Sequence, residues 1–223
     1  MNWVSEIVDP ERRLALAYAP RDRRQALAVL WALDERLGAI VAATREAMLG
    51  EIRLAWWRDA LETLETSAPR GEPLLEAAAP LVRAHRLTPA DLARLADGWT
   101  ALLGPLPLER ASLAAHGEER GAVLFRLSAA ILGGGHSGLD DAGASWALVD
   151  LASRIQDRAT AEAACALAGE RMARLGAGRW QRPLRSLAVL TALARRDCRT
   201  GRSRRQGAPG RLALALWSGV TGR

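Results

Sequence analysis

The sequence predicts an all-α protein. Apolar residues recur at helical spacing along nearly the whole chain of 223 residues. No segment shows the alternation of β-branched residues that is typical of a strand. The breaks between periodic segments are short, so we expect roughly eight to ten helices in one compact, multi-layered domain around a central cavity. That domain is expected to span residues 1–223.

The first predicted helices start at a clear signal and place an acid among apolar residues. Asp9 before Pro10 is typical of a helix start. The next predicted helix, residues 21–44, has an apolar stripe made of Leu27, Leu30, Trp31, Leu37 and Val41. Asp34 lies on the same stripe, and carboxylates are rarely buried without a partner. We therefore expect Asp34 to pair with an arginine, for which Arg53 is the leading candidate, or to line a polar cavity.

The third predicted helix, residues 48–64, contains two adjacent tryptophans, Trp56 and Trp57. Neighbours on a helix point about 100° apart, so both indoles are buried only if the helix is covered on a broad face. Leu49, Ile52 and Trp56 form its predicted packing stripe. Core packing is the favoured interpretation of both tryptophans.

The second half of the chain has the same organisation. Thr88 before Pro89 is another helix start, and glycine- or proline-rich segments predict loops at 66–73, 104–107, 133–143, 176–183 and 200–210. The arginines of residues 195–205 fit a solvated loop better than a lipid or RNA contact. Two distant cysteines and three isolated histidines predict no metal site built from these residue types.

The composition narrows the partners and the location. The net charge of +6 would usually suggest nucleic acid, but the chain has no lysine and is rich in Ala, Arg, Gly and Leu, as a GC-rich genome produces. We therefore expect no nucleic-acid partner. The first ten residues lack the features of a signal peptide, and no apolar run reaches about 18 residues. A cytoplasmic location is expected, with peripheral contact to the inner face of a membrane left open.

Several segments resemble the squalene/phytoene synthase family. They are "ALAVLWALDERLGAIVAATREAMLGEIRLAWWRDAL" (26–61), "RGAVLFRLSAAILGG" (120–134) and "AGASWALVDLASRIQDRA" (142–159). The tryptophan segment is the specific one. The resemblance implies an α-helical isoprenoid-synthase fold in which the tryptophan helix packs inside other helices around a prenyl cavity. It also implies head-to-head joining of two prenyl diphosphates.

Catalysis in that family uses two D-x-x-x-D motifs on facing helices. Acids four residues apart share a helix face, so they jointly hold the Mg²⁺ ions that pull off the diphosphate. If Asp34 is the first acid here, the second position is Gly38; a shifted register places Gly38 and Ala42 there. The second motif aligns with Arg154 and Arg158. An arginine about 4 Å from a divalent ion costs about 8 kcal/mol at an effective dielectric near 20.

Two hypotheses follow from these departures. In the first, the protein has lost Mg²⁺-dependent prenyl transfer, needs no cofactor and acts by binding a prenyl lipid or a protein partner. A similar spacing occurs in a family branch that serves as a mitochondrial assembly factor for respiratory complex I. For this first hypothesis, the expected cavity or binding residues of the chain are Arg53, Trp56, Trp57, Arg154 and Arg158. Arginine also suits a bare diphosphate, which would then bind without metal.

The second hypothesis is an active, Mg²⁺-dependent prenyltransferase in isoprenoid biosynthesis. Its acids would come from unexpected positions, namely Asp34, Glu35, Asp150 and Asp157. Asp150 and Asp157 are seven residues apart, which places them on one face of a continuous helix. The broken motifs favour the first hypothesis.

Overall fold

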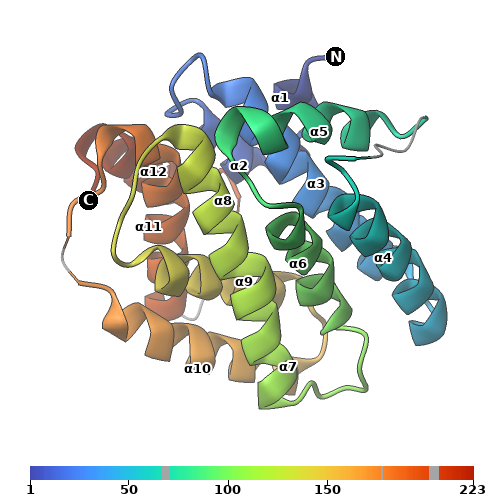
Figure 1. Cartoon of the computed structure of the whole chain (residues 1–223). Coiled ribbons are helices and arrows are strands. Elements are labelled where there is room, and N and C mark those ends of the chain that lie inside the picture. The colour runs from blue at the N-terminus through green and yellow to red at the C-terminus, as the bar shows by residue number, and fades with distance from the viewer. Residues whose placement is uncertain (67–70, 177, 201–205) are drawn as a thin grey trace.

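The computed structural model describes residues 1–66, 71–176, 178–200 and 206–223, and it confirms the all-α prediction (Figure 1). Helices are the regular elements of these residues, which contain no strand. The amino-terminal half contains α1 (Trp3–Glu6), α2 (Pro10–Leu16), α3 (Arg24–Ala43), α4 (Ala47–Glu62), α5 (Pro73–His85) and α6 (Pro89–Thr100). None of the described helices combines the length and apolar composition needed to cross a membrane.

The carboxy-terminal half supplies the centre of the fold. It contains α7 (Arg110–Ala115), the π-helical η1 (His116–Ala122), α8 (Val123–Leu132), α9 (Leu139–Arg154), α10 (Arg158–Arg174), the short 3-10 turn η2 (Arg182–Leu184), α11 (Arg185–Thr200) and α12 (Pro209–Thr221). In α9, every residue from Ala142 to Leu151 is buried, because η1, α8, α10 and α11 all pack against it. A helix that is covered all round belongs in the core.

Glycines allow the central helices to approach closely. A Cβ atom added at Gly121 of η1 would lie 2.2 Å from the carbonyl oxygen of Gly143 in α9. A Cβ atom at Gly98 of α6 would lie 2.4 Å from the backbone nitrogen of Arg120. No side chain fits at either contact, so the backbones of α6, η1 and α9 lie against one another. This packing places Arg120 in the middle of the molecule.

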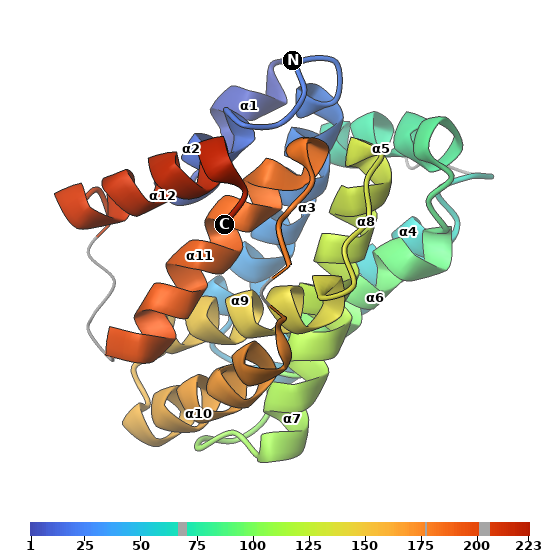
Figure 2. The ribbon, with the colours of Figure 1, turned by 90° about the vertical axis from the view of Figure 1, so that its left-hand side faces the viewer.

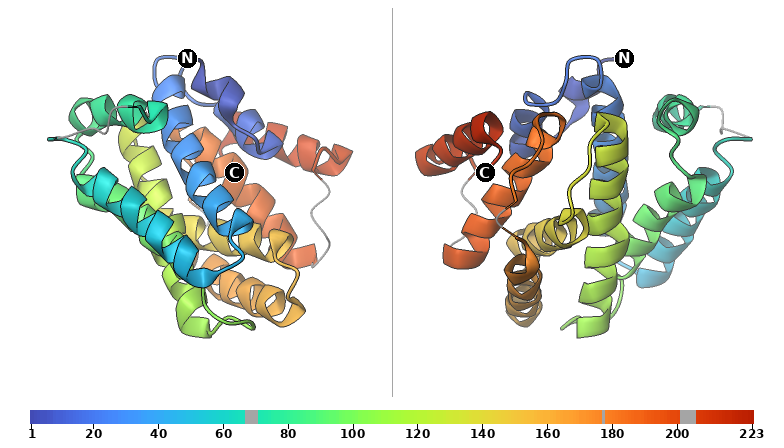
Figure 3. Two further views of the ribbon diagram at one scale, coloured as in Figure 1. Left: turned by 90° about the vertical axis from the view of Figure 1, so that its right-hand side faces the viewer. Right: turned by 60° about the vertical axis from the view of Figure 1, so that its left-hand side comes forward.

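Helix α4 lies at the edge of the molecule, which corrects the predicted packing of the tryptophan helix. It packs mainly against α6 and to a smaller extent against α3, at one side of the molecule (Figure 3). Trp57 is buried, but Trp56 is 49% exposed, and the predicted stripe of Leu49, Ile52 and Trp56 faces solvent. The buried residues of α4 are instead Gly50, Leu54, Trp57, Ala60 and Leu61.

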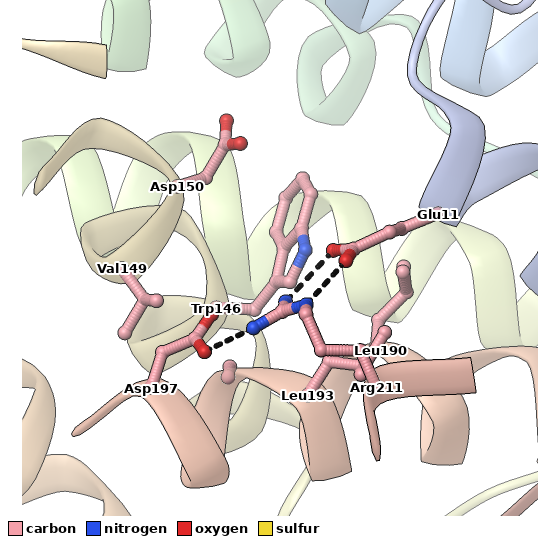
Figure 4. Close-up of a pocket in the computed structure, with 9 residues that line it drawn as sticks. Glu11, Trp146, Val149, Asp150, Leu190, Leu193, Asp197 and Arg211 are labelled. Carbon is pink, nitrogen blue, oxygen red and sulfur yellow. Dashed lines mark hydrogen bonds and ion pairs between the residues drawn. The ribbon is translucent and has the colours of Figure 1, made fainter. Parts of the chain in front are cut away.

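Helix α12 is fixed to the rest of the fold by a buried arginine. Arg211 donates to both carboxylate oxygens of Glu11 in α2, at 2.6 and 3.0 Å, and also contacts Asp197 of α11 (Figure 4). Bidentate pairs of this kind fix orientation as well as adding energy. Figure 2 shows α11 and α12 together on this side of the molecule. Residues 195–200, predicted as part of an arginine-rich loop, belong to α11, and residues 201–205 lie outside the described residues.

Candidate functional site

The predicted cavity is present and has a volume of about 650 Å³. Residues of α2, α3, α6, η1 and α9 line it, together with the chain just before α2 and Gln206. Its charged lining residues are Asp9, Arg12, Glu35, Arg120, Asp150 and Arg154. Its apolar lining residues include Val41, Ala42, Leu102, Leu151 and Ile155. One ligand could therefore meet both a charged wall and an apolar wall.

Asp34 lies fully buried beneath this cavity, and both of its carboxylate oxygens are hydrogen-bonded. Oδ1 accepts from Trp99 Nε1 at 2.9 Å and from Arg120 Nε at 3.0 Å. Oδ2 accepts from Arg120 Nη2 at 3.1 Å and from Arg12 Nη2. The prediction that Asp34 is buried against arginine is confirmed, but Arg53 is the wrong partner because it lies exposed on α4.

Arg120 joins buried acids on the two helices that correspond to the motif segments, Asp34 on α3 and Asp150 on α9. Its Nη2 group donates to Asp34 of α3 and, at 2.9 Å, to Oδ2 of Asp150 on α9. The guanidinium carbon also lies 4.1 Å from the centre of the Trp99 ring, a cation–π contact. Arg120 is 1% exposed. A single buried arginine therefore holds the two carboxylates that face each other across the site.

A second arginine closes the outer side of the site. Arg154 Nε donates to Asp150 Oδ1 at 2.9 Å, and its Nη2 donates to Asp9 Oδ2 at 3.0 Å. Asp9 also caps α2, as predicted, by accepting from the backbone N–H groups of Glu11 and Arg12. The Arg154 side chain is 55% exposed, so this pair lies at the rim of the cavity.

Glu35 has a structural role at the same rim. Its carboxylate accepts from the backbone N–H groups of Val8, at 2.8 Å, and Asp9, at 3.2 Å. These bonds hold the segment before α2 against α3. The nearest guanidinium nitrogen of Arg12 is 3.9 Å away, so that contact is an ion pair and no hydrogen bond.

The protonation states of the buried groups follow from their neighbours. Burial alone would raise the pKa of Asp34, but Arg120 and Arg12 outweigh it and hold this pKa well below its usual range. Burial and the charge of Arg120 lower the pKa of His116 to about 4. His116 is therefore neutral near pH 7. Because Arg120 only donates, His116 Nε2 accepts from Arg120 Nη1 and Nδ1 donates to the Gly98 carbonyl, at 3.3 and 2.7 Å.

The position one turn after Asp34 has no room for a second acid. A Cβ atom at Gly38 would lie 2.7 Å from two carbons of the Trp99 ring. The indole of Trp99 thus occupies the space that an aspartate side chain at residue 38 would need. Glycine at 38 and tryptophan at 99 are complementary, and the ring is held by its hydrogen bond to Asp34.

Several residues predicted for the site lie elsewhere. Helix α9 ends at Arg154, so Asp157 does not share a helix face with Asp150; it caps α10 by accepting from Thr160 N at 2.7 Å. Arg158 is exposed and pairs with Glu162. Neither residue lines the cavity, and neither do Arg53, Trp56 and Trp57. Asp150, Arg154 and Glu35 do line it, and Asp34 lies directly beneath.

The residues that were not predicted are Arg12, Trp99, His116 and Arg120. His116 and Arg120 are one turn apart, and Arg120 is followed directly by the apolar run 121–125. A charged residue next to core residues on a predicted helix indicates a buried charge, so this pattern could have identified Arg120. Arg12 and Trp99 carry no comparable local signal. Their role depends on contacts with Asp34, 22 and 65 residues away in the chain.

The side chains present do not fit the Mg²⁺ cluster that two D-x-x-x-D motifs on facing helices would hold. Such ions need free carboxylate oxygens, whereas Asp34 and Asp150 both receive hydrogen bonds from guanidinium groups. The other positions that align with the motifs hold Gly38 in α3 and, in the second segment, Arg154 and Arg158. Among the described residues, no three or more His, Cys, Asp or Glu side chains are grouped so that they could hold a metal ion.

Comparison with known proteins agrees with the fold and the resemblance. A model of the squalene/phytoene synthase family matches residues 7–223. The solved structure of a dehydrosqualene synthase in complex with ligand superposes with a TM-score of 0.72 at 12% sequence identity. The match covers 98% of this chain and 94% of that one, and at this identity it shows a shared fold. No curated protein sequence matches this chain.

Proposed function

This chain belongs to the squalene/phytoene synthase family, and from this we propose that it is a member that binds a prenyl lipid and does not carry out Mg²⁺-dependent prenyl transfer. The observation that carries the proposal is the position of Arg120. Its guanidinium lies between Asp34 and Asp150, where facing carboxylates would otherwise hold metal. A buried, hydrogen-bonded arginine is costly to displace because both buried acids would lose a charged donor.

The cavity supports the binding half of the proposal. Its volume of about 650 Å³ falls within the range of small-molecule sites, and such sites combine apolar walls with a few polar groups. Val41, Leu102 and Ile155 supply apolar surface for a hydrocarbon chain. The charged wall formed by Arg120 and Arg154 lies in the same cavity and orients a polar head.

Filling the cavity is expected to abolish binding. Ala42 and Ala43 are both exposed at the end of α3, but Ala42 lines the cavity and Ala43 does not. In the variant Ala42→Trp, the indole takes the space of the ligand, so we expect isothermal titration calorimetry to detect no binding of farnesol or farnesyl diphosphate. Ala43→Trp, the matched control, is expected to bind as the wild type does.

Two outcomes would count against the proposal. Equal binding by the Ala42→Trp and Ala43→Trp variants would place the lipid outside the cavity. Failure of the wild type to bind either ligand would favour a protein partner, the second candidate. That candidate is supported by the exposed apolar stripe of Leu49, Ile52 and Trp56 on α4, since exposed apolar patches mark interaction surfaces.

A further inference from the structure

We propose that the exposed face of α12 binds the surface of a membrane that contains anionic lipids. This inference does not depend on the proposed function, because none of the described residues of α12 lines the cavity. It follows from the way in which α12 is turned on the fold and from the charges at its two ends.

Helix α12 is amphipathic, but its apolar side faces solvent. Its buried residues are Arg211, Ala215, Ser218 and Gly219. The large apolar residues on the opposite side are between 43% and 63% exposed, namely Leu212, Leu216, Trp217 and Val220. Their spacing places them on one side of the helix, and together they form the α12 apolar face. A surface helix usually has the reverse arrangement, with its apolar stripe toward the core.

Contacts on the buried side fix this orientation of α12. Arg211 is bonded to Glu11 of α2 and Asp197 of α11. A Cβ atom at Gly219 would lie 2.3 Å from a ring carbon of Tyr18, so α12 also packs closely on the chain just after α2. Figure 2 shows α12 at the outside of the molecule, beside α2 and α11. The apolar face cannot turn inward without breaking a buried ion pair.

Exposed arginines lie at both ends of the α12 apolar face. Arg196 of α11 donates through Nη1 to the carbonyl of Gly210, at 3.2 Å, where α12 starts. Arg179 donates through Nε to the carbonyl of Thr221, at 2.6 Å, where α12 ends. From residue 198 to residue 223 the sequence contains no Asp or Glu. Apolar side chains flanked by arginine are the combination that binds anionic lipid headgroups.

A lipid surface suits this face better than a second copy of the chain does. Two α12 helices paired about a two-fold axis would bring arginine-bearing ends together, whether they ran parallel or antiparallel, and like charges repel. The exposed stripe of α4 offers a contrast, because Glu51, Asp59 and Glu62 are exposed on that helix. These acids would repel anionic lipid. Trp217 adds a residue type that is enriched at membrane–water interfaces.

Co-sedimentation of the full chain with lipid vesicles tests the inference. Vesicles of phosphatidylcholine alone are compared with vesicles of an equimolar mixture of phosphatidylcholine and phosphatidylglycerol. We expect at least about tenfold tighter binding to the anionic vesicles, and we expect added salt to weaken it. Failure of the wild type to bind the anionic vesicles, or equal binding to both kinds of vesicle, would overturn the inference.

Two double variants locate the contact. Leu216→Ser with Trp217→Ser removes most of the α12 apolar face and is expected to weaken vesicle binding at least about tenfold. Ile52→Ser with Trp56→Ser makes a matched change on exposed residues of α4 and is expected to bind vesicles as the wild type does. Circular dichroism shows whether both variants are folded. An equal loss of binding in the two variants would overturn the assignment to α12.

Hydrogen exchange on the wild type locates the contact without any variant. We expect the amides of residues 209–221 to exchange more slowly when anionic vesicles are present, and those of residues 47–62 to be unchanged. Protection of residues 47–62 alone, or of neither segment, would contradict the inference. Analytical ultracentrifugation without lipid tests the other occupant. A wild-type dimer that Leu216→Ser with Trp217→Ser converts to a monomer would assign the face to a second copy and overturn the proposal.

Discussion

Replacing Arg120 by methionine is expected to lower the free energy of unfolding by about 3 to 5 kcal/mol. Methionine roughly preserves the apolar length of the side chain but removes the guanidinium that joins Asp34 to Asp150. Both carboxylates are almost fully buried, so each would lose a charged donor in a poorly solvated position. Urea unfolding followed by circular dichroism measures the loss.

Arg154→Met is the matched control for this change. Arg154 bonds the same Asp150 carboxylate, but its side chain is 55% exposed. Water can replace it, so the expected loss is about 1 kcal/mol or less. If the two variants are destabilised equally, Arg120 is not the group that stabilises the buried acids.

The adjacent tryptophans of α4 are expected to differ sharply in their contribution to stability. Trp57 is 5% exposed and belongs to the core, so Trp57→Ala should cost about 3 to 5 kcal/mol. Trp56 is half exposed and touches Trp57 edge-on, with 5.4 Å between ring centres, so Trp56→Ala should cost about 1 kcal/mol or less. Urea unfolding of the two variants under the same conditions provides the comparison. The reverse order of losses would show that α4 packs through the opposite face.

The tryptophan helix shows why packing faces were predicted less well than helices. The residues of α4 carry two apolar stripes, one with Leu49, Ile52 and Trp56 and one with Leu54, Trp57 and Leu61. Both satisfy helical spacing, and spacing alone does not say which one meets the core. The second stripe continues to Leu64, which is also buried, and its greater length was the available clue.

The burial of Asp34 was predictable, whereas its partners were not. An acid on the apolar stripe of α3 must be compensated, so an arginine partner follows from the physics of burial. Which arginine meets it depends on tertiary packing. Arg12 and Arg120 lie 22 and 86 residues away in the chain, and local sequence does not distinguish either of them from Arg53, which precedes the tryptophan pair.

A helix end explains why the predicted shared face of Asp150 and Asp157 is absent. Asp150 and Asp157 would share a face if α9 continued, but the helix stops at Arg154 and Asp157 starts the next one. Aspartate is a preferred N-cap residue, so Asp157 is a helix-start signal that local sequence carries. The fit between Gly38 and the Trp99 ring, by contrast, requires the packing of α6 on α3 and has no local sign.

The central claim, that arginine has taken the place of metal-bound acids, is tested most directly by a single-turnover assay. Purified protein in excess over labelled farnesyl or geranylgeranyl diphosphate is incubated with Mg²⁺, and the products are extracted and separated. The account predicts no condensed prenyl product and no release of inorganic diphosphate above the buffer rate. Condensed product that requires Mg²⁺ and disappears in Asp150→Asn would contradict it, and would show that Asp34, Glu35 and Asp150 serve an active transferase.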